Sequence, residues 1–142
     1  MRKIEHIGIA VKDIEVSNKL FSSLFNVDGP YKIEEVESES VTTSFFKNGP
    51  NKIELVQGTK EDDAINKYIA KRGEGMHHIA FDVADIKAEM ARLKAEGFSL
   101  LSEEPKRGAD NKWVCFVHPK TANGVLIELC QEITDDSAPS SI

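Results

Sequence analysis

Two histidines and two glutamates stand at matching places in the two halves of the sequence. His6 and Glu54 belong to the first half, and His78 and Glu128 occupy the equivalent places in the second. Imidazole nitrogens and carboxylate oxygens are ligands of divalent cations, and four of them leave one or two positions for water or substrate. A single strand histidine or glutamate is more often structural or solvated, so the repetition carries the interpretation. The pattern predicts one metal centre formed by all four residues.

The segments around these residues indicate what positions them. Residues 6–14 and 78–86 share His, Ile, Val, Asp and Ile at equivalent places, and residues 53–57 and 127–131 share Ile, Glu, Leu and Gln. Alternating apolar residues predict strands. Alternation puts each histidine and glutamate on the face opposite to its apolar neighbours. A glutamate among such neighbours needs a partner, which a metal ion supplies.

Both histidine strands are followed by a helical pattern. Each pattern begins after an aspartate, Asp13 or Asp85, whose carboxylate suits the N-cap position. Gly97 is expected to end the second helix. The expected apolar faces comprise Ile14, Leu20, Phe21, Leu24 and Phe25 in the first helix, and Ile86, Met90 and Leu93 in the second.

The order of predicted elements is β-α-β-β-β in both halves, with a helix at about residues 62–73 that links them. Further strands are expected near residues 31–35, 41–47, 100–103 and 113–117. The chain, residues 1–142, is therefore expected to form a single α+β domain. Its expected parts are a first module at about 4–58, the linking helix, a second module at about 76–132 and a disordered tail at 134–142.

Composition restricts the class of protein. A chain of 142 residues with 40% hydrophobic and 30% charged content suits one globular domain. The net charge of −6 argues against a general nucleic-acid or membrane-surface binder. Cys115 and Cys130 lie in apolar stretches and are expected to be reduced core thiols. With no apolar run long enough to span a bilayer and no signal-peptide pattern, the expected location is cytoplasmic.

Several motifs resemble those of the vicinal oxygen chelate superfamily, also named after glyoxalase, bleomycin resistance protein and dioxygenase. The motifs are residues 6–11, 71–81, 118–120 and 124–129, and the resemblance covers about residues 4–131. Within the superfamily the sequence is most similar to the methylmalonyl-CoA epimerase family. The resemblance implies two tandem βαβββ modules that form a cupped, eight-stranded mixed sheet around a metal site, and a homodimer.

The resemblance also implies the chemistry. It predicts an isomerase that interconverts the R and S epimers of methylmalonyl-CoA by moving the proton alpha to the thioester carbonyl. By position, His6, Glu54, His78 and Glu128 match the family's metal ligands, and Glu128 is also its general base. The expected cofactor is one divalent ion, Co, Ni, Mn or Zn, because a site of nitrogen and oxygen ligands admits each of them. The expected partner is a small acyl-CoA substrate, without nucleic acid or membrane.

One position departs from the family pattern. Some members carry a second catalytic glutamate on the strand predicted at 41–47, and the matching residue in this sequence is Thr43. Glu39 lies on the same predicted face as Thr43, and it would match the second catalytic glutamate only if the strand register shifts. The second proton transfer is therefore left to water, Glu54 or an unassigned residue.

Two other histidines have structural interpretations. His77 falls on the apolar face of its strand and is expected to be structural or to support the ligands. His118 precedes a proline at the end of a strand and is expected to be a turn residue, with contact to a ligand at the pocket rim as the alternative.

Three alternative functions fit parts of the pattern. Glyoxalase I, or lactoylglutathione lyase, applies similar chemistry to a hemithioacetal. An Fe(II) dioxygenase needs more open positions than a site with four protein ligands leaves. A metal-free small-molecule or antibiotic-binding protein of the same fold has no need of four matched ligands.

The charge of the second half weakly favours a substrate with a phosphorylated CoA carrier. The basic residues concerned are Lys106, Arg107, Lys112 and Lys120.

Overall fold

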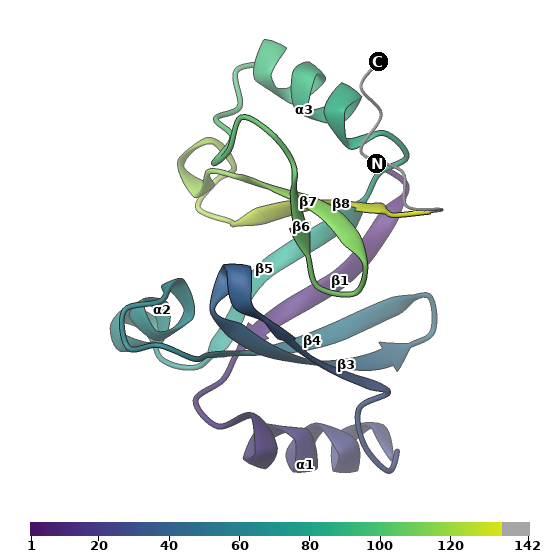
Figure 1. Ribbon diagram of the computed structural model, residues 1–142, viewed down its shortest axis with the longest axis vertical. Helices are drawn as coiled ribbons and strands as arrows, with labels where there is room; N and C mark the ends of the chain where they lie inside the picture. The colour runs from purple at the N-terminus through teal and green to yellow at the C-terminus, as the bar shows by residue number, and fades with distance from the viewer. Residues whose placement is uncertain (135–142) are drawn as a thin grey trace. The chain divides into compact units, whose positions relative to one another are not determined.

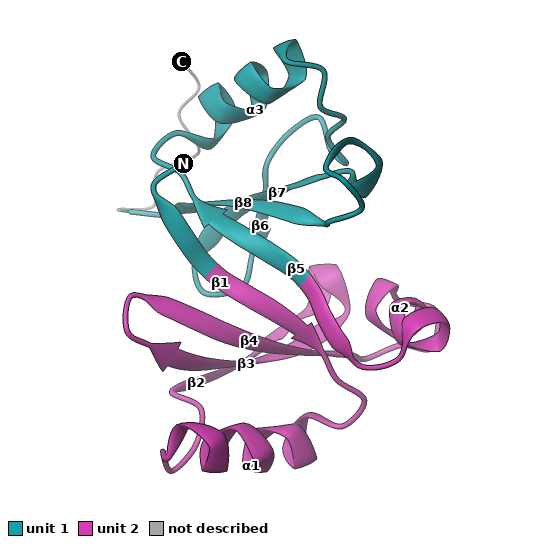
Figure 2. Ribbon diagram, turned by 180° about the vertical axis from the view of Figure 1, so that it is seen from behind, with its two compact units in different colours: residues 1–5, 78–142 teal, residues 6–77 magenta. Residues whose placement is uncertain are grey.

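The computed structural model describes residues 1–134 (Figure 1). The described chain forms two compact units: unit 1 comprises residues 1–5 and the described residues from 78 onward, and unit 2 comprises residues 6–77 (Figure 2). Strands β1 (Lys3–Ala10) and β5 (Gly75–Asp82) contribute residues to both units. Apart from Thr134, the tail expected to be disordered lies outside the described residues.

Unit 2 contains a mixed sheet with a helix packed on one face (Figure 1). Its other elements are α1 (Ile14–Phe25), β2 (Lys32–Val36), the short 3-10 helix η1 (Glu37–Glu39), β3 (Val41–Asn48), β4 (Asn51–Gly58) and α2 (Ala64–Arg72). The strand order is β2-β3-β4-β1. β1 and β4 are parallel, whereas the other two pairs are antiparallel. The core between the sheet and α1 includes Phe46, Leu55, Phe21 and Phe25.

Unit 1 repeats this arrangement. After β5 it contains α3 (Ile86–Ala95), β6 (Lys106–Gly108), β7 (Lys112–Val117), the 3-10 helix η2 (Pro119–Thr121) and β8 (Ile127–Glu132). The strand order is β5-β8-β7-β6, and again only the first pair is parallel. Ile86, Met90 and Leu93 pack on the sheet as predicted. The two βαβββ modules predicted from the sequence are confirmed.

Both predicted helix starts are also confirmed. Asp13 accepts hydrogen bonds from the N–H groups of Glu15 and Val16, and Asp85 accepts one from Ala88. Gly97 has a φ of 97° and directly follows the C-cap of α3. Within the described part of the chain, no helix combines the length and the apolar character needed to cross a membrane.

The strand predicted at residues 100–103 is wrong. The second strand of this module is β6, at Lys106–Gly108, and Leu100 makes only an isolated bridge to Val117. The Ser102 hydroxyl instead donates a hydrogen bond to the carbonyl oxygen of Glu104, where the chain bends. Pro105 follows and has no N–H to donate to a ladder. The continuous ladder with β7 therefore starts after the proline.

The predicted apolar face of α1 is partly wrong. Ile14, Phe21 and Phe25 pack toward Phe46, but 58% of Leu20 and 66% of Leu24 are exposed. At 3.6 residues per turn, positions 20 and 24 lie about 80 to 120° around the helix from position 14, whereas positions 21 and 25 lie within about 20° of it. The sheet therefore buries a narrower stripe than the sequence suggested.

Gly58, at the end of β4, leaves room for the carboxylate that caps α2. A Cβ at this position would overlap the buried Asp63. Asp63 accepts hydrogen bonds from the N–H groups of Lys60, at 2.8 Å, and Asn66, at 2.7 Å, and so is held in place. We expect Gly58→Ala to lower the free energy of unfolding by about 1 to 3 kcal/mol in thermal denaturation.

Gly29→Ala is the matched control for this prediction. A Cβ at Gly29 meets nothing within 4 Å. Its effect on stability should stay within about 0.5 kcal/mol, as for most surface changes. Equal melting temperatures for Gly58→Ala and the wild type would contradict the predicted overlap.

Candidate functional site

In unit 2 the structure brings together one predicted histidine and one predicted glutamate. His6 Nε2 on β1 lies 3.2 Å from Glu54 Oε1 on β4, and the two residues are only 5% and 6% exposed. Gly8 is opposite Glu54 in the parallel ladder, and His6 lies two residues before Gly8 on β1. His6 and Glu54 therefore lie on the same face of the sheet. Ile9 and Leu55 pack toward α1 on the other face of the sheet. The predicted alternation therefore holds for this pair.

Unit 1 contains the equivalent pair. His78 Nε2 on β5 lies 3.1 Å from Glu128 Oε1 on β8, and the residues are 7% and 6% exposed. Ala80 is opposite Glu128, so this histidine also lies two residues before the glutamate's partner in the ladder. The ring of Phe116 meets the His78 ring edge to face, with centroids 5.8 Å apart. This contact limits rotation of the imidazole.

The donor set of the two pairs suits a divalent cation. Each unit supplies one imidazole nitrogen and one carboxylate that are almost inaccessible to water. Divalent Zn, Co, Ni and Mn each accept this mixture of nitrogen and oxygen ligands. Burial of a carboxylate is costly unless it is paired, and a cation offsets that cost. The residues present therefore fit a metal.

The other two histidines make structural contacts. In unit 2, the His77 ring packs edge to face on Tyr68, with centroids 4.9 Å apart, and the Tyr68 hydroxyl donates to the carbonyl oxygen of Met76. In unit 1, His118 Nδ1 accepts a hydrogen bond from the Lys120 N–H at the start of η2. The prediction that His118 is a turn residue is confirmed.

Thr43 lies on β3, at the position that matches the second catalytic glutamate of some family members, and it carries no carboxylate. Its side chain is 1% exposed, and its hydroxyl donates to the carbonyl oxygen of Glu34 at 3.3 Å. Phe45 is opposite Glu54 in the antiparallel ladder, so Thr43, two residues away, lies on the same face as Glu54. Glu39 lies in η1, outside β3, and is exposed. The register shift that Glu39 would require does not occur.

The four basic residues of the second half differ in exposure. Lys112 is buried, and the Arg107 guanidinium bonds to Asn111 Oδ1 at 2.9 Å and lies over the Trp113 ring. Lys106 and Lys120 are exposed. The basic character that weakly favoured a phosphorylated carrier therefore rests mainly on these two lysines and on the exposed Arg107.

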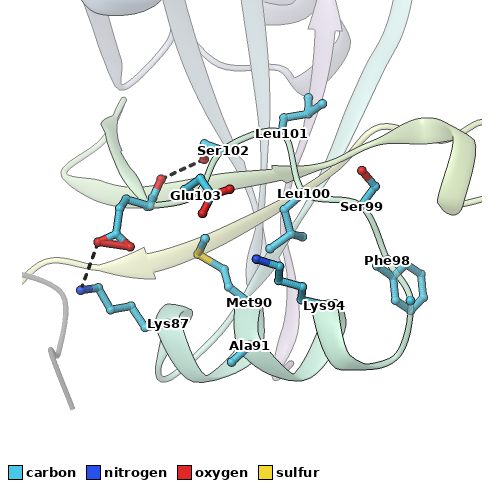
Figure 3. A pocket seen from close by; sticks show the side chains of 12 residues that line it. Lys87, Met90, Ala91, Lys94, Phe98, Ser99, Leu100, Leu101, Ser102 and Glu103 are labelled. Carbon is cyan, nitrogen blue, oxygen red and sulfur yellow. Dashed lines mark hydrogen bonds and ion pairs between the residues drawn. The ribbon is translucent and has the colours of Figure 1, made fainter.

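A cavity of about 680 Å³ lies in unit 1 between α3 and the loop that follows it (Figure 3). An ion pair of 3.7 Å between Lys87 Nζ and Glu104 Oε1 crosses one end of it. The four predicted ligands lie outside the lining of this cavity. Its walls are Lys87, Met90, Ala91, Lys94 and residues 97–104.

The two cysteines are buried thiols, as predicted. Burial raises the pKa of the Cys115 thiol, which lies 3.7 Å from Ser102 Oγ. A raised pKa keeps the thiol protonated at neutral pH, and a protonated thiol is a poor nucleophile. Cys115 is therefore a residue of the core rather than a candidate for covalent catalysis.

Sequence reasoning missed two glutamines. Gln57 Oε1 accepts a hydrogen bond from the N–H of Ile14 at 2.7 Å, and Gln131 Oε1 accepts one from Ile86 at 2.8 Å. Each ties the end of a glutamate-bearing strand to the start of a helix. The internal repeat contained a signal for these two residues, because the matching segments 53–57 and 127–131 both end in glutamine.

Comparisons with known proteins agree with the fold and the predicted family. Residues 5–116 match the model of the Glyoxalase/Bleomycin resistance protein/Dioxygenase superfamily. The chain is 37% identical to an ethylmalonyl-CoA/methylmalonyl-CoA epimerase of Cereibacter sphaeroides, over 91% of this chain and 97% of that protein. It is 36% identical to a mitochondrial methylmalonyl-CoA epimerase of Dictyostelium discoideum, over 89% of this chain and 76% of the relative.

A solved structure extends the likeness to three dimensions. A variant of the methylmalonyl-CoA epimerase of Streptomyces coelicolor, in complex with 2-nitronate-propionyl-CoA, superposes with a TM-score of 0.90 at 34% identity. The alignment covers 94% of this chain and 99% of that one. The predicted vicinal oxygen chelate fold is thus confirmed, and the chain belongs to the Glyoxalase/Bleomycin resistance protein/Dioxygenase superfamily.

Proposed function

We propose that this protein is a methylmalonyl-CoA epimerase, an isomerase that moves the proton at the carbon alpha to a thioester carbonyl. The observation that carries the proposal is the similarity to methylmalonyl-CoA epimerases over nearly the whole chain. The solved relative with 2-nitronate-propionyl-CoA supports an acyl-CoA substrate. The two buried His–Glu pairs supply acid–base groups that such a reaction requires.

The four paired residues are proposed to hold one divalent ion, chosen among Co, Ni, Mn and Zn. His6 and Glu54 would contribute from unit 2, and His78 and Glu128 from unit 1. When bound, such an ion supplies Lewis-acid polarisation of the thioester carbonyl. The similar burial and the similar His–Glu distances of the two pairs support a joint role.

Glu128 is proposed to be the general base as well as a ligand. Its carboxylate is buried beside His78 Nε2, and the Phe116 ring packs on that histidine. Burial keeps bulk water from competing with a bound substrate for the carboxylate. Packing and hydrogen bonding hold the pair in one orientation, as general base catalysis requires.

Epimerisation also needs proton delivery to the opposite face of the alpha carbon. Thr43 offers no carboxylate, and its hydroxyl donates to a backbone carbonyl oxygen. Glu54 is the remaining buried carboxylate among the proposed ligands. We therefore assign the second proton transfer to Glu54 or to water.

A comparison of two substrates tests the proposed activity. With one metal loading, we expect exchange of the alpha proton of methylmalonyl-CoA in deuterated water, followed by NMR. The glutathione hemithioacetal of methylglyoxal should give little lactoylglutathione. Lactoylglutathione formation without methylmalonyl-CoA exchange would instead identify a glyoxalase I. Ligand binding without turnover of either compound would favour a binding protein of the same fold.

The quaternary structure and location are proposed on the resemblance. We propose a homodimer in the cytoplasm, and the two buried thiols suit a reducing compartment. Sedimentation equilibrium of the purified chain distinguishes a dimer from a monomer.

A further inference from the structure

In each half of the chain, a glutamine on the strand that carries the glutamate is hydrogen-bonded to the segment that follows the histidine strand. Gln57 lies three residues after its glutamate, and Gln131 lies three residues after the other. The N–H groups that they bind, of Ile14 and Ile86, lie eight residues after the two histidines. The spacing is identical in both modules, and the two hydrogen bonds, of 2.7 Å and 2.8 Å, are nearly equal in length.

Backbone hydrogen bonds beside these links are equally matched. The Val11 N–H donates to the carbonyl oxygen of Val56 at 2.9 Å, and the Val83 N–H donates to that of Cys130 at 2.9 Å. Each acceptor directly precedes a glutamine. In each module, therefore, two hydrogen bonds follow one another at the end of the parallel pair. The first joins backbone to backbone, and the second joins the glutamine side chain to the first residue of the helix that follows the histidine strand.

The parallel strands need such a link because no short turn sets their register. β3 and β4 are joined by a tight turn that aligns them, with Asn48 opposite Asn51. By contrast, a helix and two strands separate β1 from β4 along the chain, and the same holds for β5 and β8. A slip of two residues would keep every side chain on its face but move Glu54 about 6.6 Å along the strand of His6. The His–Glu contact would be lost.

Helix capping alone does not explain the glutamines. The carboxylate of Asp13 already accepts from Glu15 and Val16, and that of Asp85 accepts from Ala88. The glutamines take a different donor, the N–H of the first helical residue. They are also anchored on the glutamate strands rather than on the helices, so their bonds oppose sliding of one strand along the other.

We propose that Gln57 and Gln131 are positioning residues that set the register of the parallel strands and thereby align each histidine with its glutamate. This proposal rests on the proposed function in one respect, that the two pairs bind a metal. The glutamines act through His6–Glu54 and His78–Glu128 rather than as ligands themselves.

Metal affinity tests the proposal in the full chain. Gln57→Leu and Gln131→Leu remove the acceptor at similar size, and each should weaken Co²⁺ binding in calorimetric titration by at least about 10-fold, as loss of supporting contacts typically does. Gln57→Glu and Gln131→Glu keep an acceptor, and a carboxylate suits a helix N-terminus, so both should restore nearly wild-type affinity.

The matched controls are Asp13→Ala and Asp85→Ala, which weaken the same helix starts without touching the strand link. They should lower the melting temperature but leave Co²⁺ affinity within about twofold of wild type, far less than the loss that removed supporting contacts cause. If Asp13→Ala weakened Co²⁺ binding as much as Gln57→Leu, the glutamine would only fasten the helix and the proposal would fail.

Amide hydrogen exchange without metal separates this proposal from the proposed function. Gln57→Leu should accelerate exchange at Val11 by at least about 10-fold relative to Phe46, which lies in the antiparallel β3–β4 ladder. Gln131→Leu should act likewise at Val83. If amide exchange at Val11 relative to Phe46 were unchanged in Gln57→Leu, the register role would be overturned, whether or not the chain binds the metal. Failure of the wild type to bind Co²⁺, with these exchange changes present, would overturn only the proposed metal site.

Discussion

Changing Glu128 to glutamine is expected to slow exchange of the methylmalonyl-CoA alpha proton by about 10² to 10⁴-fold, the usual contribution of a general base. The amide keeps an oxygen in the place of the carboxylate beside His78 but has no basic lone pair to accept the proton at neutral pH. Metal content should therefore fall less than activity. Solvent exchange followed by NMR, with elemental analysis of the same sample, measures both quantities.

Glu132→Gln is the matched control for this experiment. It makes the same chemical change on the same strand, β8, at an exposed residue. Its exchange rate should equal that of the wild type. If Glu128→Gln kept wild-type exchange at equal metal content, Glu128 would be a ligand only and the base would have to be sought first at Glu54.

A second measurement on Glu54→Gln distinguishes the two sources of the other proton. If Glu54 delivers it, the variant should still exchange the proton of one epimer but complete inversion more slowly. If water delivers the second proton, the rates of exchange and of inversion should decrease by the same factor, and only as far as the variant loses metal. Stereochemically pure substrates in deuterated water separate exchange from inversion.

Changing His78 to alanine is expected to abolish stoichiometric metal binding. The variant removes one of two imidazoles from the proposed donor set and leaves Glu128 without the nitrogen that lies 3.1 Å from it. Elemental analysis after dialysis should give about one metal ion per chain for the wild type and a small fraction of that for the variant, since each ligand contributes directly to affinity.

His77→Ala is the adjacent control, because its ring packs on Tyr68 rather than on a carboxylate named in the proposed donor set. It should retain the metal. Full occupancy in His78→Ala with loss in His77→Ala would mean that the ligand was assigned one residue out of place. Thermal denaturation of both variants shows whether either loss reflects unfolding, since removing one partner of a buried ion pair costs about 3 to 5 kcal/mol.

Local patterns in the sequence were sufficient to predict the two βαβββ modules, their helix starts and the four candidate ligands. These patterns are strand alternation, helical periodicity and an aspartate before each helix. The internal repeat made single residues interpretable, because a histidine or glutamate that is ambiguous alone becomes informative when it recurs at the same place. Asp13 and Asp85 illustrate this, since both cap their helices as predicted.

How those residues meet depends on the folded chain. The pairing of His6 with Glu54 requires the register of two parallel strands that are distant in sequence, which no local pattern specifies. Packing of α1 on the sheet left Leu20 exposed but not Phe21. The roles of Gln57 and Gln131 became visible only in three dimensions, because their hydrogen-bond partners lie 43 and 45 residues away. Local periodicity determines which face a side chain occupies, but only long-range pairing determines which side chain it meets.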